Sequence, residues 1–388
     1  MLGRRLDLIE KARAIGQSVA GPNAGAVDKD GRFPAESIAA LKDAKLLSAF
    51  VPTKYGGEGC SVGDLLSICH ALGQHCSASA MVFAMHQIQV ACAVRHAGSS
   101  AYFADYQREL VKQQWLLASA TSEAGIGGDA RSSSCAVEQS GQSLALTKNA
   151  TTISYGAHAD GILATARRNP DAPASDQVLV ALHKKDYALE RTSNWDTLGM
   201  RGTCSNGFLL KAKGTMDQVL PLPYGDISAH TMLPVSHLTW AALWLGIATD
   251  AVSRARSFIR TEARKKPGSV PAGAVRLAEV VNMLQLMKAN VVACAEHYQA
   301  IADQPEALTA IGVAIELNNL KAGTSQMALQ VVHHAMLICG IHGYKNDTKF
   351  SVGRHLRDLH STVLMVNNDR LFGITASLLL VHKEDTTL

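Results

Sequence analysis

The chain has 388 residues, of which 47% are hydrophobic and 18% are charged. This length exceeds what one hydrophobic core usually fills, so two or three domains are expected, and the composition excludes an intrinsically disordered protein. Lysine and arginine number 37 against 33 aspartates and glutamates, which gives a net charge of +4. So small an excess over this length does not indicate a protein that binds nucleic acid or an anionic membrane.

The cysteines and the N-terminus also narrow the class of protein. The eight cysteines form no CxxC pair and have no metal-like spacing, so no metal site is expected. The N-terminal stretch MLGRRLDLIEKARAIG carries regular charges and lacks the apolar core of a signal peptide. No run of eighteen uncharged apolar residues occurs, so no membrane span is predicted. A reduced, cytoplasmic protein is therefore expected.

Residues 1–114 have a helical pattern. The segment ESIAALKDAKLL has apolar residues at helical spacing, and residues 62–98 predict a long, mostly buried helical hairpin. Between them, the connector AFVPTKYGGEG contains a proline and three glycines, which indicate a turn-rich link. This part is predicted to be an N-terminal α domain.

Residues 115–224 have a different pattern, which is typical of strands. The stretch LALTKNATTISYGAHADGILATARR is rich in β-branched residues and glycine, with frequent turn signals, so an all-β domain is predicted. No GxGxxG motif follows a strand, which argues against a Rossmann nucleotide-binding domain.

Residues 225–388 are helical again. Four long amphipathic segments with short joins predict a four-helix bundle. The last segment includes RHLRDLHSTVLMVNNDR at 354–370, which we predict as one continuous helix bearing His360, Val366 and Asp369. The whole chain is therefore predicted to be an α+β protein with an N-terminal α domain, a middle β domain and a C-terminal four-helix bundle.

Four motifs lie in order along the chain. They are PTKYGGEG at 52–59, SEAGIGGD at 122–129, TISYGAHAD at 152–160, and GIHGY at 340–344 followed by RD at 357–358. As an ordered set they resemble P-x-x-Y-G-G-x-G, T-E-P-x-A-G-S-D, W-I-T-N-G-x-x-A-D and G-G-x-G-Y with R-D of the acyl-CoA dehydrogenase superfamily. The resemblance covers essentially the whole chain and implies the acyl-CoA dehydrogenase fold.

This resemblance also implies a cofactor and partners. FAD would lie between the β domain and the bundle of a homodimer or homotetramer, and an acyl-CoA or other thioester would enter beside it. Electrons would pass to an acceptor flavoprotein. The residues that the resemblance assigns to the cofactor are Thr121, Ser122, Gly127, Gly128, Thr152 (where the family has tryptophan), Ser154 (a hydroxyl near flavin N5), Arg264 (with Arg260 as an alternative) and Gly340.

The family's catalytic base has no counterpart at its usual position. In the dehydrogenases, a glutamate eight residues after the R-D aspartate removes the α-proton while hydride leaves for flavin N5. Here that position is Val366, and the family's second location, residues 234–237, also lacks a carboxylate. Asp369, expected one helical turn beyond Val366 on a similar face, is the candidate base. Its alternative role is that of a surface or capping acid.

A second branch of the superfamily suggests a different chemistry. Its two-component monooxygenases bind reduced flavin, for which FMN is possible, and activate O2. This chain is similar to them at His86, in WDTLGMRGTCS at 195–205, and in RHLRD at 354–358. His86 would donate a hydrogen bond to activated oxygen, or it is a satisfied core histidine. His360 is a further catalytic candidate.

Three functions follow from these motifs. The leading hypothesis is a FAD-dependent oxidoreductase that forms an α,β-double bond in an acyl thioester with a non-standard base. The alternative is a two-component monooxygenase fed by a flavin reductase. The third is a catalytically degenerate homologue that still binds flavin or acyl groups.

Overall fold

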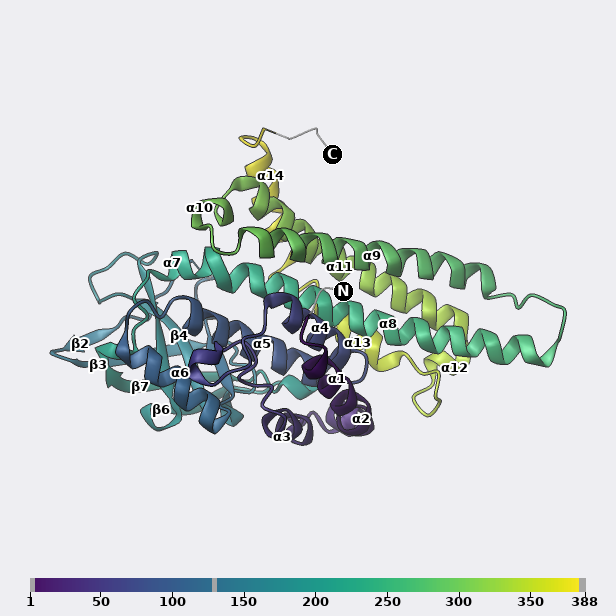
Figure 1. Cartoon of the computed structure of the whole chain (residues 1–388), viewed down its shortest axis with the longest axis horizontal. Coiled ribbons are helices and arrows are strands. Elements are labelled where there is room, and N and C mark those ends of the chain that lie inside the picture. Colours follow the sequence, from purple (N-terminus) through teal and green to yellow (C-terminus); the bar gives the residue numbers. More distant parts are fainter. Residues whose placement is uncertain (1–3, 128–130, 384–388) are drawn as a thin grey trace.

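The computed structural model describes residues 4–127 and 131–383. Helices form both ends of the chain, and the strands gather at one end of an elongated molecule (Figure 1). The first strand begins at Leu117 and the first helix after the sheets begins at Tyr224. The predicted order is confirmed, with a helical N-terminal part, a middle sheet part and a helical C-terminal part.

The N-terminal part is a helical layer packed against the long helices that follow later in the chain. Its α-helices are α1 (Leu6–Ile15), α2 (Gly21–Asp30), α3 (Ala35–Asp43), α4 (Val62–Gly73), α5 (Ser77–Arg95) and α6 (Ala101–Gln113). α4 begins at a capping box, in which Ser61 and Asp64 bond each other's backbone N–H groups. α5 is buried on nearly all sides because it packs against α4, the helix α8 (Leu233–Lys265) and the strand β1 (Leu117–Ala120).

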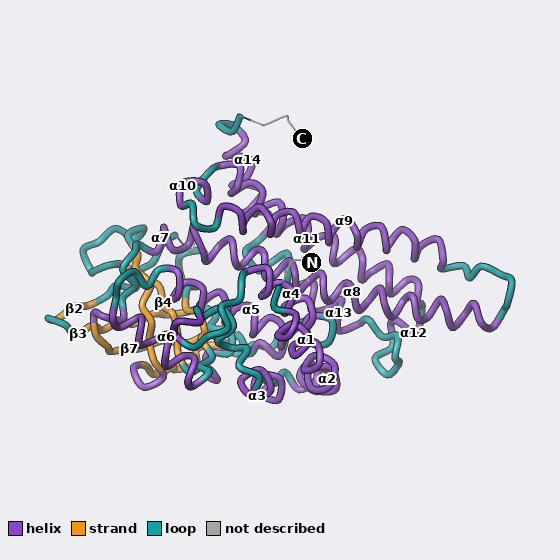
Figure 2. The backbone as a smooth tube through the Cα atoms, in the orientation of Figure 1, coloured by secondary structure: helices purple, strands orange, loops and turns teal. Residues whose placement is uncertain are grey.

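The middle part contains two small sheets, drawn as strands in Figure 2. The first has the order β1 (Leu117–Ala120), β4 (Gly161–Arg167) and β5 (Gln177–His183), with β1 and β4 parallel. The second is antiparallel and has the order β2 (Glu138–Ser140), β3 (Ser143–Ala150), β7 (Gly207–Thr215) and β6 (Tyr187–Ser193). β3 alternates between exposed and buried positions, as expected for a strand with one face in a core.

The C-terminal part is built on one long helix. α8 (Leu233–Lys265) has 33 residues and spans about 50 Å. It runs from the sheets to the opposite end of the molecule, packed against α4, α9 and α11 (Figure 1). The other helices of this part are α7 (Tyr224–Ile227), α9 (Ala274–Ile301), α10 (Pro305–Leu308), α11 (Ile311–Cys339), α12 (Ile341–Tyr344), α13 (Gly353–His360) and α14 (Asn368–Leu379).

The prediction of one continuous helix over residues 354–370 is wrong. α13 ends at His360, a turn occupies residues 361–367, and α14 begins at Asn368. Val366 has φ +49°, a left-handed conformation that a helix does not contain, and the Asn367 side chain caps α14. Asp369 therefore does not lie one turn beyond Val366 on the same helix.

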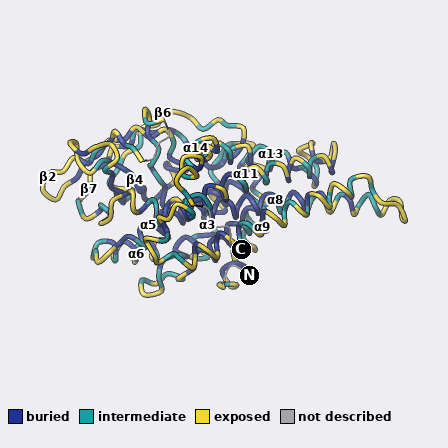
Figure 3. The backbone as a smooth tube through the Cα atoms, turned by 90° about the horizontal axis from the view of Figure 1, so that it is seen from above, coloured by how far each residue is buried: buried dark blue, intermediate teal, exposed yellow. Residues whose placement is uncertain are grey.

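Three helices are long and apolar enough to cross a membrane by length and composition. They are residues 77–95, 224–265 and 274–301. In the first two, 89% and 94% of the apolar window is buried inside the chain, so packing accounts for their hydrophobicity. In α9 only 22% is buried, and the end of the molecule that α8 and α9 form is largely exposed (Figure 3).

All eight cysteines lie in the described part of the chain and are free thiols. Seven of them are buried. Within residues 4–127 and 131–383, no group of three or more His, Cys, Asp or Glu side chains is arranged to hold a metal ion.

Candidate functional site

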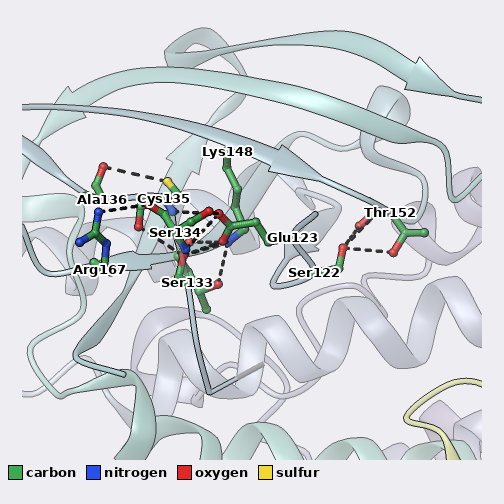
Figure 4. Close-up of polar contacts among 10 residues, drawn as sticks. Ser122, Glu123, Ser133, Ser134, Cys135, Ala136, Lys148, Thr152 and Arg167 are labelled. Carbon is green, nitrogen blue, oxygen red and sulfur yellow. Dashed lines mark hydrogen bonds and ion pairs between the residues drawn. The ribbon is translucent and has the colours of Figure 1, made fainter. Parts of the chain in front are cut away.

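A buried ion pair anchors the loop that follows β1 (Figure 4). Lys148 on β3 is inaccessible to solvent, and its Nζ lies 2.8 Å from Glu123 Oε2 and 3.0 Å from the carbonyl oxygen of Thr165. Ser133 Oγ donates to the same carboxylate at 2.7 Å. Burial opposes the charge of Glu123, but hydrogen bonds from Lys148, Ser134 and Ser133 outweigh it and lower the pKa of Glu123 to about 2. The loop is thus held in place by the buried Lys148–Glu123 ion pair, whose charged groups also have hydrogen-bond partners.

Hydroxyl groups gather where this loop meets the segment after β3. Ser122 Oγ donates to the carbonyl oxygen of Thr152 at 2.8 Å and accepts from its N–H at 3.1 Å (Figure 4). Ser154 Oγ lies 2.8 Å from Ser205 Oγ, which lies 2.8 Å from Thr203 Oγ1. The structure therefore brings Ser122 together with Thr152, and it links Ser154 to Thr203 and Ser205 of the motif at 195–205.

The glycines of the loop leave open space. Gly125 has φ +90° and Gly127 has φ +57°, and a Cβ atom added to either would meet nothing within 4 Å. Backbone in this conformation favours glycine and lets a planar or phosphate-bearing ligand approach closely. Thr121 lies half-buried at the start of the loop, and Gly128 lies outside the described residues.

The first turn of α14 reaches this loop. Arg370 Nη2 donates to the carbonyl oxygen of Gly127 at 2.6 Å. Asp369, next to it, has an exposed side chain, and its backbone N–H donates to Asn367 Oδ1 at 2.8 Å. An acid in the first turn of a helix is stabilised by the helix dipole. Asp369 is thus a first-turn acid near the loop, rather than a group on the same helical face as Val366.

Val366 occupies the position of the family's base in the turn before α14. Its side chain is 41% exposed, and its carbonyl oxygen accepts a hydrogen bond from Lys321 Nζ at 2.7 Å. At the family's second location, His237 is buried and its Nδ1 lies 3.0 Å from the carbonyl oxygen of Leu317. An apolar side chain and a structural histidine therefore stand at the two places where the motif resemblance leads us to expect a carboxylate.

The other two catalytic candidates lie in different surroundings. His86 is fully buried, with Nε2 2.7 Å from the carbonyl oxygen of Leu47 and Nδ1 2.9 Å from the N–H of Leu117. Burial lowers the pKa of His86 to about 4, so the ring is neutral and connects α5 to β1. This geometry matches the core-histidine alternative. His360 is exposed as the last residue of α13.

Two predicted cofactor residues lie far from the loop. Arg264 is exposed in the last turn of α8, and Gly340 follows α11 with φ +54°. α8 starts beside the sheets and ends at the opposite end of the molecule (Figure 1). Within one chain, the structure does not bring Arg264 or Gly340 to Ser122.

Sequence reasoning missed Lys148, Lys321 and Arg370. Lys148 had a detectable signal, because strand alternation places it on the same face as Leu144 and Leu146. Lys321 also had one, since it lies four residues after the buried Leu317 on α11. A lysine at a core position of either element indicates a buried cation with dedicated acceptors.

Known proteins match this chain at both ends. Residues 5–123 match the acyl-CoA dehydrogenase N-terminal domain, and residues 225–365 match the acyl-CoA dehydrogenase C-terminal domain. The chain belongs to the acyl-CoA dehydrogenase superfamily. Members of the superfamily are flavin oxidoreductases or monooxygenases, typically with acyl-CoA substrates and with electron-transfer flavoproteins or flavin reductases as partners.

Individual relatives come from both branches of the superfamily. Glutaryl-CoA dehydrogenase of Desulfococcus multivorans is 24% identical over 92% of this chain and 91% of its own length. The probable FMNH2-dependent monooxygenase SfnC of Pseudomonas putida is 24% identical over 91% of this chain and 90% of its own length. FMN-bound TdsC, a dibenzothiophene monooxygenase from Paenibacillus sp. A11-2, superposes with a TM-score of 0.86 at 18% identity over 98% of each chain.

A flavin fits the site just described. Gly125 and Gly127, which have positive φ, leave open space beside their loop, and Glu123 holds this loop in place. Ser122 and Thr152 supply hydroxyl groups beside the loop, which suit the polar edge of an isoalloxazine ring. Membership of the acyl-CoA dehydrogenase superfamily supports a flavin as the cofactor.

Proposed function

We propose that this protein is a flavin-dependent monooxygenase that receives reduced flavin from a separate reductase. The observation that carries the proposal is the side chain at the family's base position, which is Val366 and cannot accept a proton. The second family location, residues 234–237, has no carboxylate either. Dehydrogenation of a thioester requires a base at the α-carbon. Oxygenation by a reduced flavin has no such requirement.

The chain's own residues would bind and shield the cofactor. A bound reduced flavin would supply two electrons to O2, so that one oxygen atom enters the substrate and the other leaves as water. Ser122, Thr152 and Ser154 would orient the ring, with Ser205 and Thr203 holding the Ser154 hydroxyl in place. Val366 would present an apolar wall, which limits access of water.

FMN is the flavin that we propose. The R-x-x-F-G motif by which relatives reach a pyrophosphate is not readable in RTEARKKPG at 260–268. FMN has no pyrophosphate, so it needs no such motif. The hydroxyl groups of Ser122, Thr152 and Ser154 and the loop that contains Gly125 and Gly127, here called the glycine loop, all belong to one chain. The relative SfnC is described as FMNH2-dependent, which supports the same choice. A flavin reductase would be the partner. The cytoplasm would be the location, because it would supply the reductase and keep the cysteine thiols of this protein reduced.

An anaerobic titration with flavin, followed by the addition of oxygen, tests this proposal. Reduced FMN, reduced FAD and both oxidised forms would be titrated by flavin fluorescence, with tightest binding expected for reduced FMN. The loaded protein would then receive 18O2 and a panel of sulfur-containing, aromatic and thioester compounds. Mass spectrometry should find one 18O atom in a product. Binding of reduced flavin without any labelled product would favour the degenerate homologue.

The leading sequence hypothesis, α,β-dehydrogenation of an acyl thioester, is the second candidate. One observation favours it, because Asp369 adjoins Arg370, whose guanidinium contacts the carbonyl oxygen of Gly127. A carboxylate therefore stands close to the glycine loop. FAD and an acceptor flavoprotein would replace FMN and a reductase in this case.

Asp369→Asn separates the two candidates. If Asp369 is the base, the wild-type protein loaded with FAD is bleached anaerobically by an acyl-CoA, and the variant loses bleaching while its FAD affinity stays within about twofold. The matched control is Glu316→Gln, which changes a partly buried acid on α11 that is paired with His297. If no acyl-CoA bleaches the wild type, the dehydrogenase candidate falls, and the 18O2 experiment decides between the monooxygenase and the degenerate homologue.

A further inference from the structure

Lys321 of α11 is a buried cation with neutral partners. Its side chain is inaccessible to solvent. Its Nζ donates to the carbonyl oxygens of Thr362 at 2.9 Å and Val366 at 2.7 Å, and to Asn368 Oδ1 at 2.7 Å. It also lies 5.9 Å from the ring centroid of Trp244. Three acceptors match the three N–H bonds of an ammonium group, so the charge is satisfied without a carboxylate.

All three acceptors belong to the turn between α13 and α14 or to the first residue after it. A turn of seven residues whose next-to-last residue is a left-handed valine has little stability of its own, because a β-branched residue rarely adopts positive φ. Backbone strain of this kind persists where surrounding contacts enforce it. The only lysine contacts to the turn in the described residues come from Lys321.

The turn is also connected to the glycine loop. Arg370 lies three residues after the turn and contacts the carbonyl oxygen of Gly127. Asn368, besides accepting from Lys321, donates through Nδ2 to Ser325 Oγ on α11 at 3.0 Å. The position of Val366 relative to the loop is therefore set by α11 on one side and by α14 on the other.

We propose that Lys321 is a positioning residue whose ammonium group holds the 361–367 turn in its strained form, and thereby fixes the wall of the site that Val366 presents. The inference rests on the proposed function only in that this wall borders a flavin. Burial lowers the pKa of Lys321 to about 8. The ammonium form is the one that offers three donors to three oxygens, since a neutral amine would turn a lone pair toward one of them.

Hydrogen–deuterium exchange on the flavin-free protein tests the proposal. The reporters are three amide groups of the turn, those of Leu364, Met365 and Asn368, which bond the carbonyl oxygens of Ser361 or Val363. Lys321→Met should speed their exchange by about tenfold or more, because the turn opens locally without its clamp. Lys148→Met, which removes the other fully buried lysine, should leave these three amides unchanged relative to the rest of α14.

A rescue variant distinguishes positioning from general stability. Asparagine tolerates positive φ better than valine does, so Val366→Asn lowers the strain that the clamp must oppose. In the Lys321→Met background, Val366→Asn should return at least part of the lost protection at the three amides. Unchanged exchange in Lys321→Met, or a loss that Val366→Asn leaves untouched, would overturn the proposal.

A milder pair of variants applies if Lys321→Met does not fold. Asn368→Ala removes one acceptor of Lys321, whereas Ser325→Ala removes only the neighbouring bond between Asn368 and α11. Faster turn exchange in the first than in the second supports the clamp, and equal exchange contradicts it. Because these measurements need no flavin, they are unaffected if the monooxygenase proposal fails in the separate flavin titration.

Discussion

Lys148 and Lys321 are both inaccessible to solvent, and each holds one of the two backbone segments that Arg370 joins. They differ in how the charge is satisfied. Lys148 has a carboxylate partner, Glu123, whereas Lys321 has two carbonyl oxygens and an amide oxygen. A buried charge that loses its partners costs far more than an exposed one, so both residues are sensitive positions.

Replacement of Lys148 by methionine should destabilise the protein strongly. The variant leaves Glu123 buried with no cation, which should lower the free energy of unfolding by about 3–5 kcal/mol in urea denaturation. Lys211→Met on β7 is the control, since its pair with Glu190 is exposed and contributes about 1 kcal/mol or less. The double variant Lys148→Met/Glu123→Gln should recover most of the loss. Equal losses for Lys148→Met and Lys211→Met would contradict a buried pair.

At the level of elements, the contact between α14 and the glycine loop is the most testable. Arg370→Ala removes the charged donor to the carbonyl oxygen of Gly127. The loop should then be less ordered before the ligand binds, and flavin affinity should fall by about three- to tenfold. Arg370→Lys retains the positive charge on a shorter side chain, so flavin affinity should fall less than in Arg370→Ala. Unaltered affinity in Arg370→Ala, measured by fluorescence titration, would mean that the contact does not support the flavin.

The order of elements was predictable because apolar residues recur at different spacings in helices and in strands. In this chain each spacing holds over a long stretch. The break before α14 was missed because residues 361–366 continue an apolar pattern that a helix also shows. Asn367 was the available signal, since asparagine before an acidic first turn is typical of a helix N-cap. The clamp by Lys321 depends on tertiary contacts across 41 residues or more, which no local pattern reveals.

The site was predictable only in part. Ser122, Thr152 and Ser154 came from the motif resemblance, and the structure brings the first two into contact. Ser205 came only as part of a motif. Its hydroxyl contacts that of Ser154, which lies 51 residues earlier in the chain, because the fold brings the two segments together. Such partners follow from the fold rather than from spacing, which is why the residues that hold the site were harder to predict than those that line it.

At the scale of the whole molecule, large apolar side chains of α9 stay exposed in the part of the chain that the structure describes. Leu286 is 56% exposed and Val275 is 69% exposed on this helix. We expect a homodimer or homotetramer that covers this surface. Leu286→Glu should shift the mass measured by light scattering toward the monomer, whereas Lys288→Gln, on the opposite side of the same helix, should not. A wild-type protein that is already monomeric would contradict this expectation.

Stability should also fall in acid in a defined range. The pKa of Glu123 is lowered from 4.5 to about 2 in the folded protein, so the unfolded chain takes up this proton first as the pH falls. The stabilising contribution is complete above about pH 4.5 and is lost toward pH 2, with a slope of up to about 1.4 kcal/mol per pH unit. Urea denaturation at several pH values should show this slope in the wild type. The Lys148→Met/Glu123→Gln variant should lack that part of it.

The length of α8 has a consequence for how the cofactor would respond to dilution. It keeps Arg264 about 50 Å from the beginning of the helix, where the sheets lie. If a dinucleotide flavin needs this arginine, a second subunit must deliver it, and apparent FAD affinity should weaken as protein concentration falls below the assembly threshold. A mononucleotide held by one chain would show no such mass-action behaviour.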